Sequence, residues 1–428
     1  MNRGFAVFII LALISVILSF VIPDNSKRGF TNALSSYMIA DEENKLNYDD
    51  TREHLRVPAE LPFEYDFDNK EFNNGFEYEF NPNFKSGYYH KPQTLKFDCS
   101  DTIWYTTDGT LPEKNKTAYL YDNEKGIRLD TGVTNICIRA EKDGKMSRVY
   151  VGSYVILGST EDAFYGYGYN TLDKYDRYIY RSLYKAMSNY ETKFDVPFTN
   201  VSYQRLYRIF MCVNYDNPLL IQAPLSFVSW SGNKKDVSSI KLIYDFSKEA
   251  SEYYVEKTKK RAEEILNTAD GSESLFDYLL TIHNEILNAE YDYTLESDGA
   301  YEAFGVLTAG SGVCESYSRA YQYLCQCIGV DNLLIVGTSN DEPHMWNMVM
   351  LGGEWYHADL TWDDGDNGGI EYYYFAFNDK NLKDYGERTI SPELNESRPI
   401  LEMYSDSNYY PIPAARGTEY SVSNILLY

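Results

Sequence analysis

GSGVCESYSRAY, residues 310–321, places a cysteine directly after a glycine-rich turn and directly before a helical pattern. After Cys314, aromatic and aliphatic residues recur at helical spacing at Tyr317, Tyr321, Leu324 and Ile328. Gly329 then ends the pattern. The sequence therefore predicts a thiol at a helix N-terminus, where free N–H groups and the helix dipole favour an anion. With an imidazolium nearby, such placement lowers a thiol pKa from about 8.5 into the range of roughly 3.5 to 7.5.

A lone cysteine in a helix is more often a small buried hydrophobic residue than a nucleophile, so Cys314 needs partners. Two strand-like stretches further along the chain flank Gly352-Gly353, at residues 344–351 and 354–362. The two glycines predict a hairpin with a two-residue turn. Counting back from that turn places Asp359 opposite Trp346, and His344 one diagonal step away on the same face. A three-residue turn would move Asp359 to the other face.

The same count pairs Met348 with His357 and makes His357 an alternative base. We favour His344 because it lies at the strand edge, nearer to the loop from which a nucleophile could approach. In this hypothesis His344 deprotonates Cys314, while Asp359 fixes the imidazole tautomer and stabilises the imidazolium. The thiolate attacks an amide carbonyl to form a thioester, which an amine or water resolves. The N–H of Cys314 is a candidate donor to the oxyanion.

These motifs resemble the core of the transglutaminase-like superfamily. The matching stretches are YEAFGVL at 301–307, GSGVCESYSRA at 310–320, HMWN at 344–347 and WYHADLTWD at 355–363. Cys314, His344 and Asp359 fall on the catalytic Cys, His and Asp of that superfamily. The resemblance implies a papain-like α+β fold, in which the helix that carries the cysteine packs on an antiparallel sheet. Its members include protein cross-linkers, peptidases and amidases, so the acyl acceptor stays open.

Two features of the superfamily have no certain counterpart in the sequence. Some members use a side-chain oxyanion donor, for which Tyr301 and Trp346 are candidates, and each of them is equally compatible with core packing. The acidic turn DDGDNGG at 363–369 lacks the ligand spacing of a calcium loop, and we interpret it as a solvated loop. We expect no metal and no other cofactor.

Short alternating segments between residues 87 and 156 are separated by Asp108-Gly109 and followed by Asp143-Gly144, which predicts a small antiparallel β-sandwich. This region resembles the C-terminal domain of chitobiases and β-hexosaminidases, an accessory unit. The resemblance implies a spacer or a glycan contact. By strand parity Cys99 and Cys137 point to opposite faces, which argues against a disulfide between them.

The region between the sandwich and the cysteine is predicted to be mostly helical. Three helices are indicated by the stripe from Leu172 to Met187, by the segment 206–213, and by residues 247–267 with Ser247 as N-cap. Two strands are predicted at 225–230 and 240–246. A fourth helix carries the stripe Leu275, Leu279, Ile282 and Ile286, and we interpret its His283 as a core or surface residue.

The predicted organisation is a signal peptide or membrane anchor at 1–23, based on the apolar run from Phe5 to Ile22, and an acidic, partly disordered linker at 24–82. A β-sandwich at 83–157, a helical segment at 158–271 and the catalytic core at 272–428 follow. The net charge of −25 argues against a nucleic-acid partner. Membrane contact is expected only through the N-terminal segment.

We therefore expect an exported thiol enzyme, secreted or held at the cell surface, with a protein or peptide substrate and a cell-wall glycan contact through the sandwich. Acyl transfer to an amine is one hypothesis, and a cysteine peptidase or amidase of the cell envelope is the second. The third is an envelope-binding or adhesion protein without catalysis, in which the three polar residues are inert.

Overall fold

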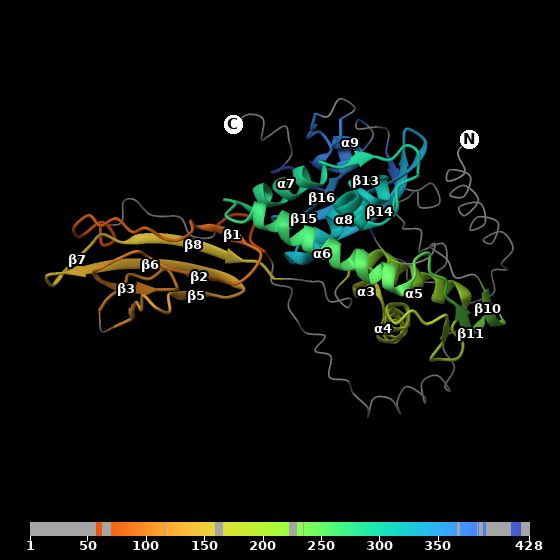
Figure 1. Cartoon of the computed structure of the whole chain (residues 1–428), viewed down its shortest axis with the longest axis horizontal. Coiled ribbons are helices and arrows are strands. Elements are labelled where there is room, and N and C mark those ends of the chain that lie inside the picture. The colour runs from red at the N-terminus through yellow and green to blue at the C-terminus, as the bar shows by residue number, and fades with distance from the viewer. Residues whose placement is uncertain are drawn as a thin grey trace.

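The computed structural model describes residues 57–61, 70–114, 116–158, 166–221, 229–233, 235–365, 369–382, 384, 388–390 and 412–420. The predicted N-terminal anchor and the first part of the predicted linker lie outside these residues. No helix within them is long and apolar enough to cross a membrane. A β-rich domain lies at one end of the molecule and an α+β domain at the other (Figure 1).

The β-rich domain is a sandwich of two unequal sheets. The larger has the order β1-β8-β6-β3-β4, with β7 paired to β6, and the smaller is the pair β2-β5. The strands are β1 (Gly87–Tyr89), β2 (Gln93–Leu95), β3 (Thr102–Thr106), β4 (Tyr119–Leu120), β5 (Ile127–Leu129), β6 (Gly132–Lys142), β7 (Lys145–Met146) and β8 (Tyr150–Ile156). The prediction of a wholly antiparallel sandwich is wrong in one respect, because β1 runs parallel to β8. That pairing joins segments far apart in the chain, which local turn signals do not encode.

Residues of the predicted linker take part in this sandwich. Phe76 forms a β-bridge with Ser147, and the ring of Phe80 lies 5.7 Å from that of Tyr150. The part of the linker from residue 70 onward therefore packs on the sandwich. Cys99 and Cys137 are both free thiols, and Cys137 is buried in the sheet.

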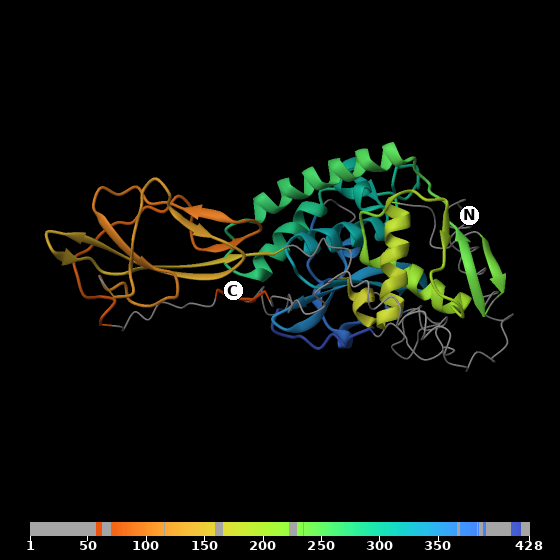
Figure 2. The same ribbon diagram turned by 90° about the horizontal axis from the view of Figure 1, so that it is seen from below.

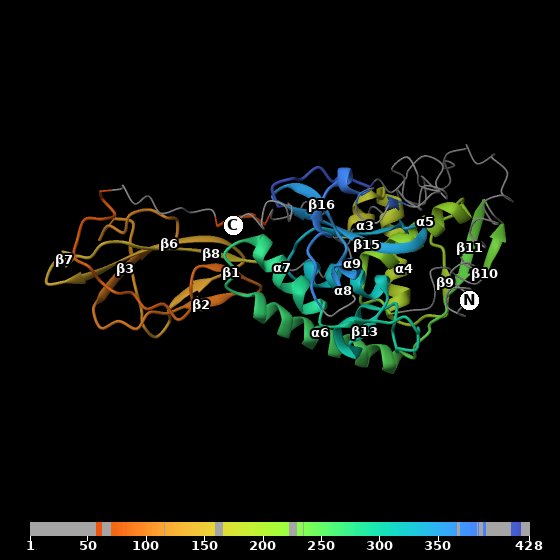
Figure 3. The ribbon, with the colours of Figure 1, turned by 90° about the horizontal axis from the view of Figure 1, so that it is seen from above.

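The α+β domain is built on an antiparallel sheet with the order β17-β16-β15-β14-β18. Its strands are β14 (Asn332–Ser339), β15 (Glu342–Leu351), β16 (Glu354–Ala358), β17 (Phe375–Phe377) and β18 (Thr389–Ile390). Helix α8 (Cys314–Cys327) packs on β15, and α6 lies on the far side of α8 (Figure 3). This is the predicted papain-like α+β arrangement, and the predicted start of the cysteine-bearing helix is confirmed.

Four longer helices surround α8 or precede it in the chain: α4 (Lys174–Ser188), α5 (Tyr203–Asp216), α6 (Lys248–Ala269) and α7 (Leu275–Ile286). The predicted N-cap Ser247 is confirmed, since its side chain accepts from the N–H of Ala250 at 3.2 Å. Leu172 is not part of α4 as predicted, because Asp173 caps that helix by accepting from the N–H groups of Tyr175 and Asp176. Helix α6 is the long helix that extends toward the sandwich (Figure 2).

The shorter elements of this domain are α3 (Tyr167–Thr171), β9 (Lys193–Asp195), β10 (Ser229–Asn233), β11 (Asp236–Lys241), β12 (Glu290–Tyr291), the π-helix η2 (Gly305–Ala309), β13 (Ser311–Gly312), α9 (Leu360–Asp363) and the 3-10 helix η3 (Asp379–Asn381). The second predicted strand at 240–246 is misplaced, because residues 242–246 form no strand. The side chain of Asn233 accepts from the N–H groups of Lys235 and Asp236, and this fixes the turn before residue 236. Residues 225–228 of the first predicted strand lie outside the described part.

Side chains of α8 complete the C-terminal end of α5. Arg319 donates to the carbonyl of Asn214, Gln322 to that of Tyr215 and Gln326 to that of Asp216, at 2.8 to 3.2 Å. The last carbonyls of a helix are not used by its own hydrogen bonds, and the three polar side chains supply partners for them. Helix α8 is therefore fixed on one side by α5 and on the other by the sheet.

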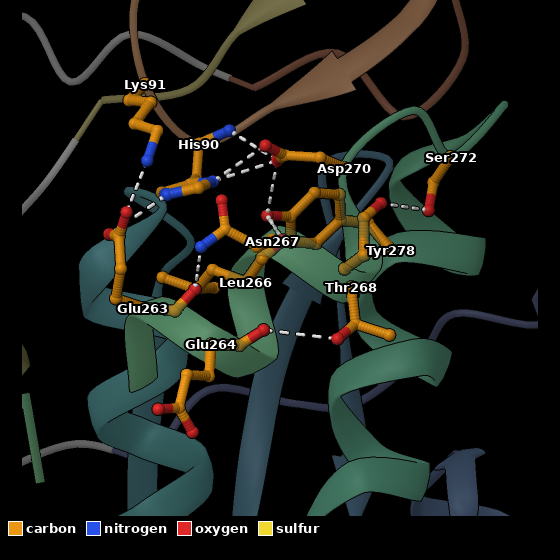
Figure 4. Close-up of polar contacts among 11 residues, drawn as sticks. His90, Lys91, Glu263, Glu264, Leu266, Asn267, Thr268, Asp270, Ser272 and Tyr278 are labelled. Atoms are coloured by element: carbon orange, nitrogen blue, oxygen red, sulfur yellow. Dashed lines mark hydrogen bonds and ion pairs between the residues drawn. The ribbon is translucent and has the colours of Figure 1, made fainter. Parts of the chain in front are cut away.

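The sandwich docks directly on the α+β domain (Figure 4). Gly271 donates its N–H to the carbonyl of Tyr88, and Tyr88 donates its N–H to the carbonyl of Ser272. His90 meets the carboxylate of Asp270 at 2.9 Å and that of Glu263 at 3.1 Å. The Tyr88 side chain is fully buried in the same hydrophobic cluster as core residues of α6 and α7. The two domains thus share part of one core.

Candidate active site

The glycine-rich turn gives Cys314 its place at the start of α8. Gly310 has a φ of +79°, a backbone conformation that residues other than glycine rarely adopt. A Cβ on Gly312 would lie 2.5 Å from the side chain of Ser316, so a larger residue could not approach the first turn of α8. The hydroxyl of Ser318 lies 2.8 Å from the carbonyl of Cys314 and 3.1 Å from that of Met345, and so links this turn to β15. The thiol is thereby set beside the strand that carries His344.

His344 joins the carboxylate to the thiol. Its Nε2 lies 2.7 Å from Oδ2 of Asp359, and its ring is close enough to the Cys314 thiol for the thiol to raise the pKa of His344. Because Nε2 is bonded to Asp359, Nδ1 is the ring nitrogen left for the sulfur. The ring stacks on Trp346 with centroids 5.9 Å apart and meets the edge of Trp362 at 6.4 Å. His344 retains 9% of its surface exposed, whereas Asp359 retains 1%.

The charges of this cluster support an imidazolium at neutral pH. Burial opposes the charge on His344, but the Asp359 carboxylate and the bond to Cys314 outweigh it and raise the pKa of His344 to about 10. Burial also opposes ionisation of Asp359, yet His344 and the guanidinium of Arg388 bring its pKa below the ordinary value. The carboxylate is therefore ionised and the imidazole protonated.

Asp359 contacts His344 from a different element of secondary structure than the one predicted. The Gly352-Gly353 turn and the pairing of Met348 with His357 are confirmed, but the ladder ends at Ala358, so the predicted pairing of Asp359 with Trp346 does not form. Asp359 instead begins α9 as its N-cap and accepts from the N–H of Trp362 at 3.4 Å. The prediction of a strand through residue 362 is wrong, because the chain turns into this short helix.

His357, the alternative base, is buried and has a partner at each ring nitrogen. It is fully buried, its Nδ1 accepts from the indole N–H of Trp346 at 3.1 Å, and its Nε2 lies 3.0 Å from Asp379. Burial lowers the pKa of His357. Both ring nitrogens are thus occupied, and the indole N–H of Trp346 is occupied as well, which removes Trp346 as an oxyanion donor. Tyr301 is 38% exposed and lies near Cys314, so it stays a candidate.

Two residues of the site were not found by sequence reasoning. Arg388 contacts Asp359, and Tyr291 accepts a hydrogen bond from the backbone N–H of Cys314. Tyr291 reaches Cys314 because β12 runs parallel to β13, with Tyr291 opposite Gly312. Neither residue belongs to a local motif, and no pattern in the sequence marks them. Within the described residues, no group of three or more His, Cys, Asp or Glu side chains could hold a metal ion; the centre of the acidic turn lies outside those residues.

A thiol at a helix N-terminus, an imidazole and a buried carboxylate on an antiparallel sheet define a papain-like arrangement. Residues 259–360 match the family model of the Transglutaminase-like superfamily, and residues 84–151 match that of the Chitobiase/beta-hexosaminidase C-terminal domain. The chain thus carries a transglutaminase-like core behind a chitobiase C-terminal-like domain, and both predicted resemblances are confirmed.

Three solved structures are similar over parts of the chain. A TGase shares 16% identity over 37% of this chain and 47% of its own, with a TM-score of 0.25. Red sea bream transglutaminase shares 11% identity over 67% of this chain and 51% of its own, with a TM-score of 0.24. The periplasmic domain of TgpA from Pseudomonas aeruginosa, bound to ethylmercury, shares 9% identity over 68% of this chain and 92% of its own, with a TM-score of 0.22. This chain spans about half the length of the first two proteins. No curated protein matches it.

Proposed function

We propose that this protein is an exported thiol enzyme that acts on peptide or glutamine side-chain amides through a thioester on Cys314. The observation that carries the proposal is the position of His344, which is bonded to the carboxylate of Asp359 and lies beside the thiol of Cys314 at the start of α8. A thiolate beside an imidazolium is the reactive form of a nucleophilic cysteine.

In the proposed reaction the Cys314 thiolate attacks the amide carbonyl, and a carbon–sulfur bond forms. The carbonyl oxygen becomes an oxyanion that the N–H of Cys314 can stabilise, after replacing the Tyr291 hydroxyl as the acceptor of that N–H. The imidazolium of His344 protonates the departing nitrogen as the carbon–nitrogen bond breaks. Neutral His344 then takes a proton from an amine or water, which attacks the thioester and releases the thiolate.

Acyl transfer and hydrolysis share every step up to the thioester and differ only in the acceptor. The deciding experiment incubates the protein with a labelled primary amine and a glutamine-containing protein. Incorporation of the amine identifies a transferase, and cleaved or deamidated product without incorporation identifies the alternative, a cysteine peptidase or amidase. Cys314→Ala serves as the negative control, because it removes only the nucleophile.

Activation of the thiol can be tested before any substrate is known. Iodoacetamide labelling of Cys314 at neutral pH, followed by mass spectrometry, is expected to be rapid and to slow strongly in His344→Ala. Cys99 provides a matched comparison in the same chain, since it is a free, partly exposed thiol whose pKa is raised by burial and by nearby carboxylates. Equal labelling of Cys314 and Cys99 in the native protein would contradict an activated pair.

We also propose export, on the basis of the apolar run from Phe5 to Ile22, and a glycan contact through the sandwich. Strand β4 at the edge of the larger sheet presents Tyr119 and Leu120, each 60% exposed. Exposed aromatic rings of this kind stack readily on sugars, and this observation favours the other hypothesis, an envelope-binding protein without catalysis. A pull-down on cell-wall polysaccharide that survives Cys314→Ala, with no turnover of amides by the native protein, would support that hypothesis over the enzyme.

A further inference from the structure

Arg388 contacts the same carboxylate oxygen as His344. Its Nη2 and Nε lie 2.6 and 3.1 Å from Oδ2 of Asp359, and Nε2 of His344 lies 2.7 Å from that atom. Arg388 is almost fully buried, and its backbone N–H donates to the carbonyl of Leu382 at 2.7 Å. It directly precedes β18, which pairs with β14. The guanidinium therefore reaches the site from the edge of the sheet opposite β17.

Aromatic rings hold the guanidinium in this position. Its carbon lies 4.6 Å from the ring centroid of Tyr374, 5.0 Å from that of Trp362 and 5.6 Å from that of Phe377. Such contacts are favourable for a cation that has lost its water. Its Nη1 has no hydrogen-bond partner among the described residues. The polar side-chain contacts of Arg388 are thus concentrated on Asp359.

We propose that Arg388 is a positioning residue that sets the pH range in which Cys314 and His344 exist as a thiolate–imidazolium pair, by sharing Asp359 with His344. The inference rests on the proposed function, because it concerns the same site. An arginine keeps its charge at every relevant pH, and a buried charge is weakly screened. The cation favours the thiolate and opposes the imidazolium, so its removal shifts both protonation steps to higher pH.

Other titratable groups near Arg388 or near the pair of Asp359 and His344 also affect these protonation steps. They are Asp359, His344, His357, Asp363, Tyr374, Asp379 and the thiol of Cys314. Asp379 is bonded to His357 and Asp363 to His283, so neither is free to replace Asp359. Arg388 is the cation in direct contact with the Asp359 carboxylate other than His344 itself.

The test measures the rate of iodoacetamide alkylation of Cys314 in the full chain as a function of pH. The native protein is expected to show a lower limb from thiolate formation and an upper limb, seen as a change in rate, where the imidazolium loses its proton and leaves a free thiolate. Arg388→Gln retains an N–H donor for Asp359 without the charge, and Arg388→Met removes both. Each should move both limbs upward by about one pH unit. Arg388→Lys keeps the charge and should leave the limbs close to those of the native protein.

Arg208→Met is the matched control, because Arg208 is also almost fully buried and also paired with an aspartate, Asp176, at 3.5 Å. It should leave both limbs unshifted. If Arg388→Gln lowers the melting temperature without moving either limb, Arg388 is only structural and the proposal falls. A shift as large in Arg388→Lys as in Arg388→Gln also overturns it. Shifted limbs in a protein that turns over no amide would support this inference and contradict the proposed function.

Discussion

In two histidine–aspartate pairs of the α+β domain both side chains are buried, and their comparison distinguishes a reactive arrangement from one that only packs. Nε2 of His344 lies 2.7 Å from Asp359, and Nε2 of His283 lies 3.0 Å from Asp363. The second nitrogen makes the difference. Nδ1 of His283 meets the side-chain oxygen of Asn284 at 3.0 Å, and the side chains of His283 and Asp363 have no exposed surface. The second nitrogen of His344 is left for the Cys314 thiol.

The two carboxylates also differ in pKa, because their charged neighbours differ. Burial raises the pKa of Asp363 to about 6, and the bond to His283 only partly offsets it. Asp359 is just as buried, but it faces both His344 and Arg388, and its pKa lies below the ordinary value. A buried histidine–aspartate pair is therefore not a site by itself. A neighbouring thiol and a permanent cation distinguish the pair of His344 and Asp359 from the other pair.

Replacement of His344 is expected to have the largest effect. His344→Ala leaves the thiol without a proton acceptor, and turnover of any amide substrate should fall by about 10⁴-fold or more. His283→Ala should leave the rate per folded molecule within a few-fold of the native value. Steady-state kinetics on both variants, corrected for the folded fraction, measures this difference. Comparable losses of turnover in the two variants would contradict a catalytic role that only His344 has.

Asp359→Asn is expected to have the next largest effect. The amide retains the shape of the carboxylate but cannot stabilise an imidazolium, so kcat should fall by roughly 10² to 10⁴-fold while KM changes little. Asp363→Asn provides the comparison on the other pair and should lower stability more than kcat. A kcat for Asp359→Asn within a few-fold of the native value would remove Asp359 from the proposed mechanism.

His283→Ala should lower the free energy of unfolding by about 2 kcal/mol, because it leaves Asp363 buried without its partner. Urea denaturation followed by circular dichroism measures this change. The iodoacetamide labelling rate of Cys314 should stay at the native value in conditions where the variant is folded. If His283→Ala lost the labelling of Cys314 but kept its full stability, His283 would belong to the reactive pair and this interpretation would be wrong.

The smallest effect is expected at another histidine–aspartate pair, His90 and Asp270, between the domains. Burial opposes a charge on His90, but Asp270 and Glu263 outweigh it and raise its pKa. A pKa raised by folding gives stability that is complete below about pH 6.5 and is lost as the pH rises through the folded-state value. His90→Gln should therefore cost about 1 kcal/mol at pH 6 and less at pH 9.

Urea unfolding of the native protein and of His90→Gln at the two pH values measures this difference. Lys85→Gln is the matched control at the same junction, because the ion pair of Lys85 with Glu273 spans 3.7 Å between two exposed side chains. Exposed pairs of this kind contribute little, so this variant should be neutral at both pH values. An equal cost of His90→Gln at pH 6 and pH 9 would show that His90 is not charged in the folded protein.

The sequence predicted those features that local chemistry specifies. Glycines mark the start of α8 and the turn between β15 and β16, and Ser247 marks the start of α6. The pairing of His344 with Asp359 followed from the turn, although Asp359 arrives as a helix cap rather than in a strand. Arg388 and Tyr291 depend on contacts between segments distant in the chain, and the bond from Trp346 to His357 depends on how two side chains are oriented within the hairpin. No periodicity records such contacts, so these residues could not be predicted from one sequence.

The junction between the domains has a consequence for how a bound polymer would meet the active site. A module on a loose tether visits many positions, and its effect on a reaction is a matter of local concentration. Here Tyr88 and His90 are bonded to the turn after α6, and Tyr88 is buried in the core that it shares with the α+β domain. A polymer held on the sandwich would therefore be presented to Cys314 from one direction and at one distance. The repeat spacing of that polymer, more than its abundance, would select which of its amides reacts.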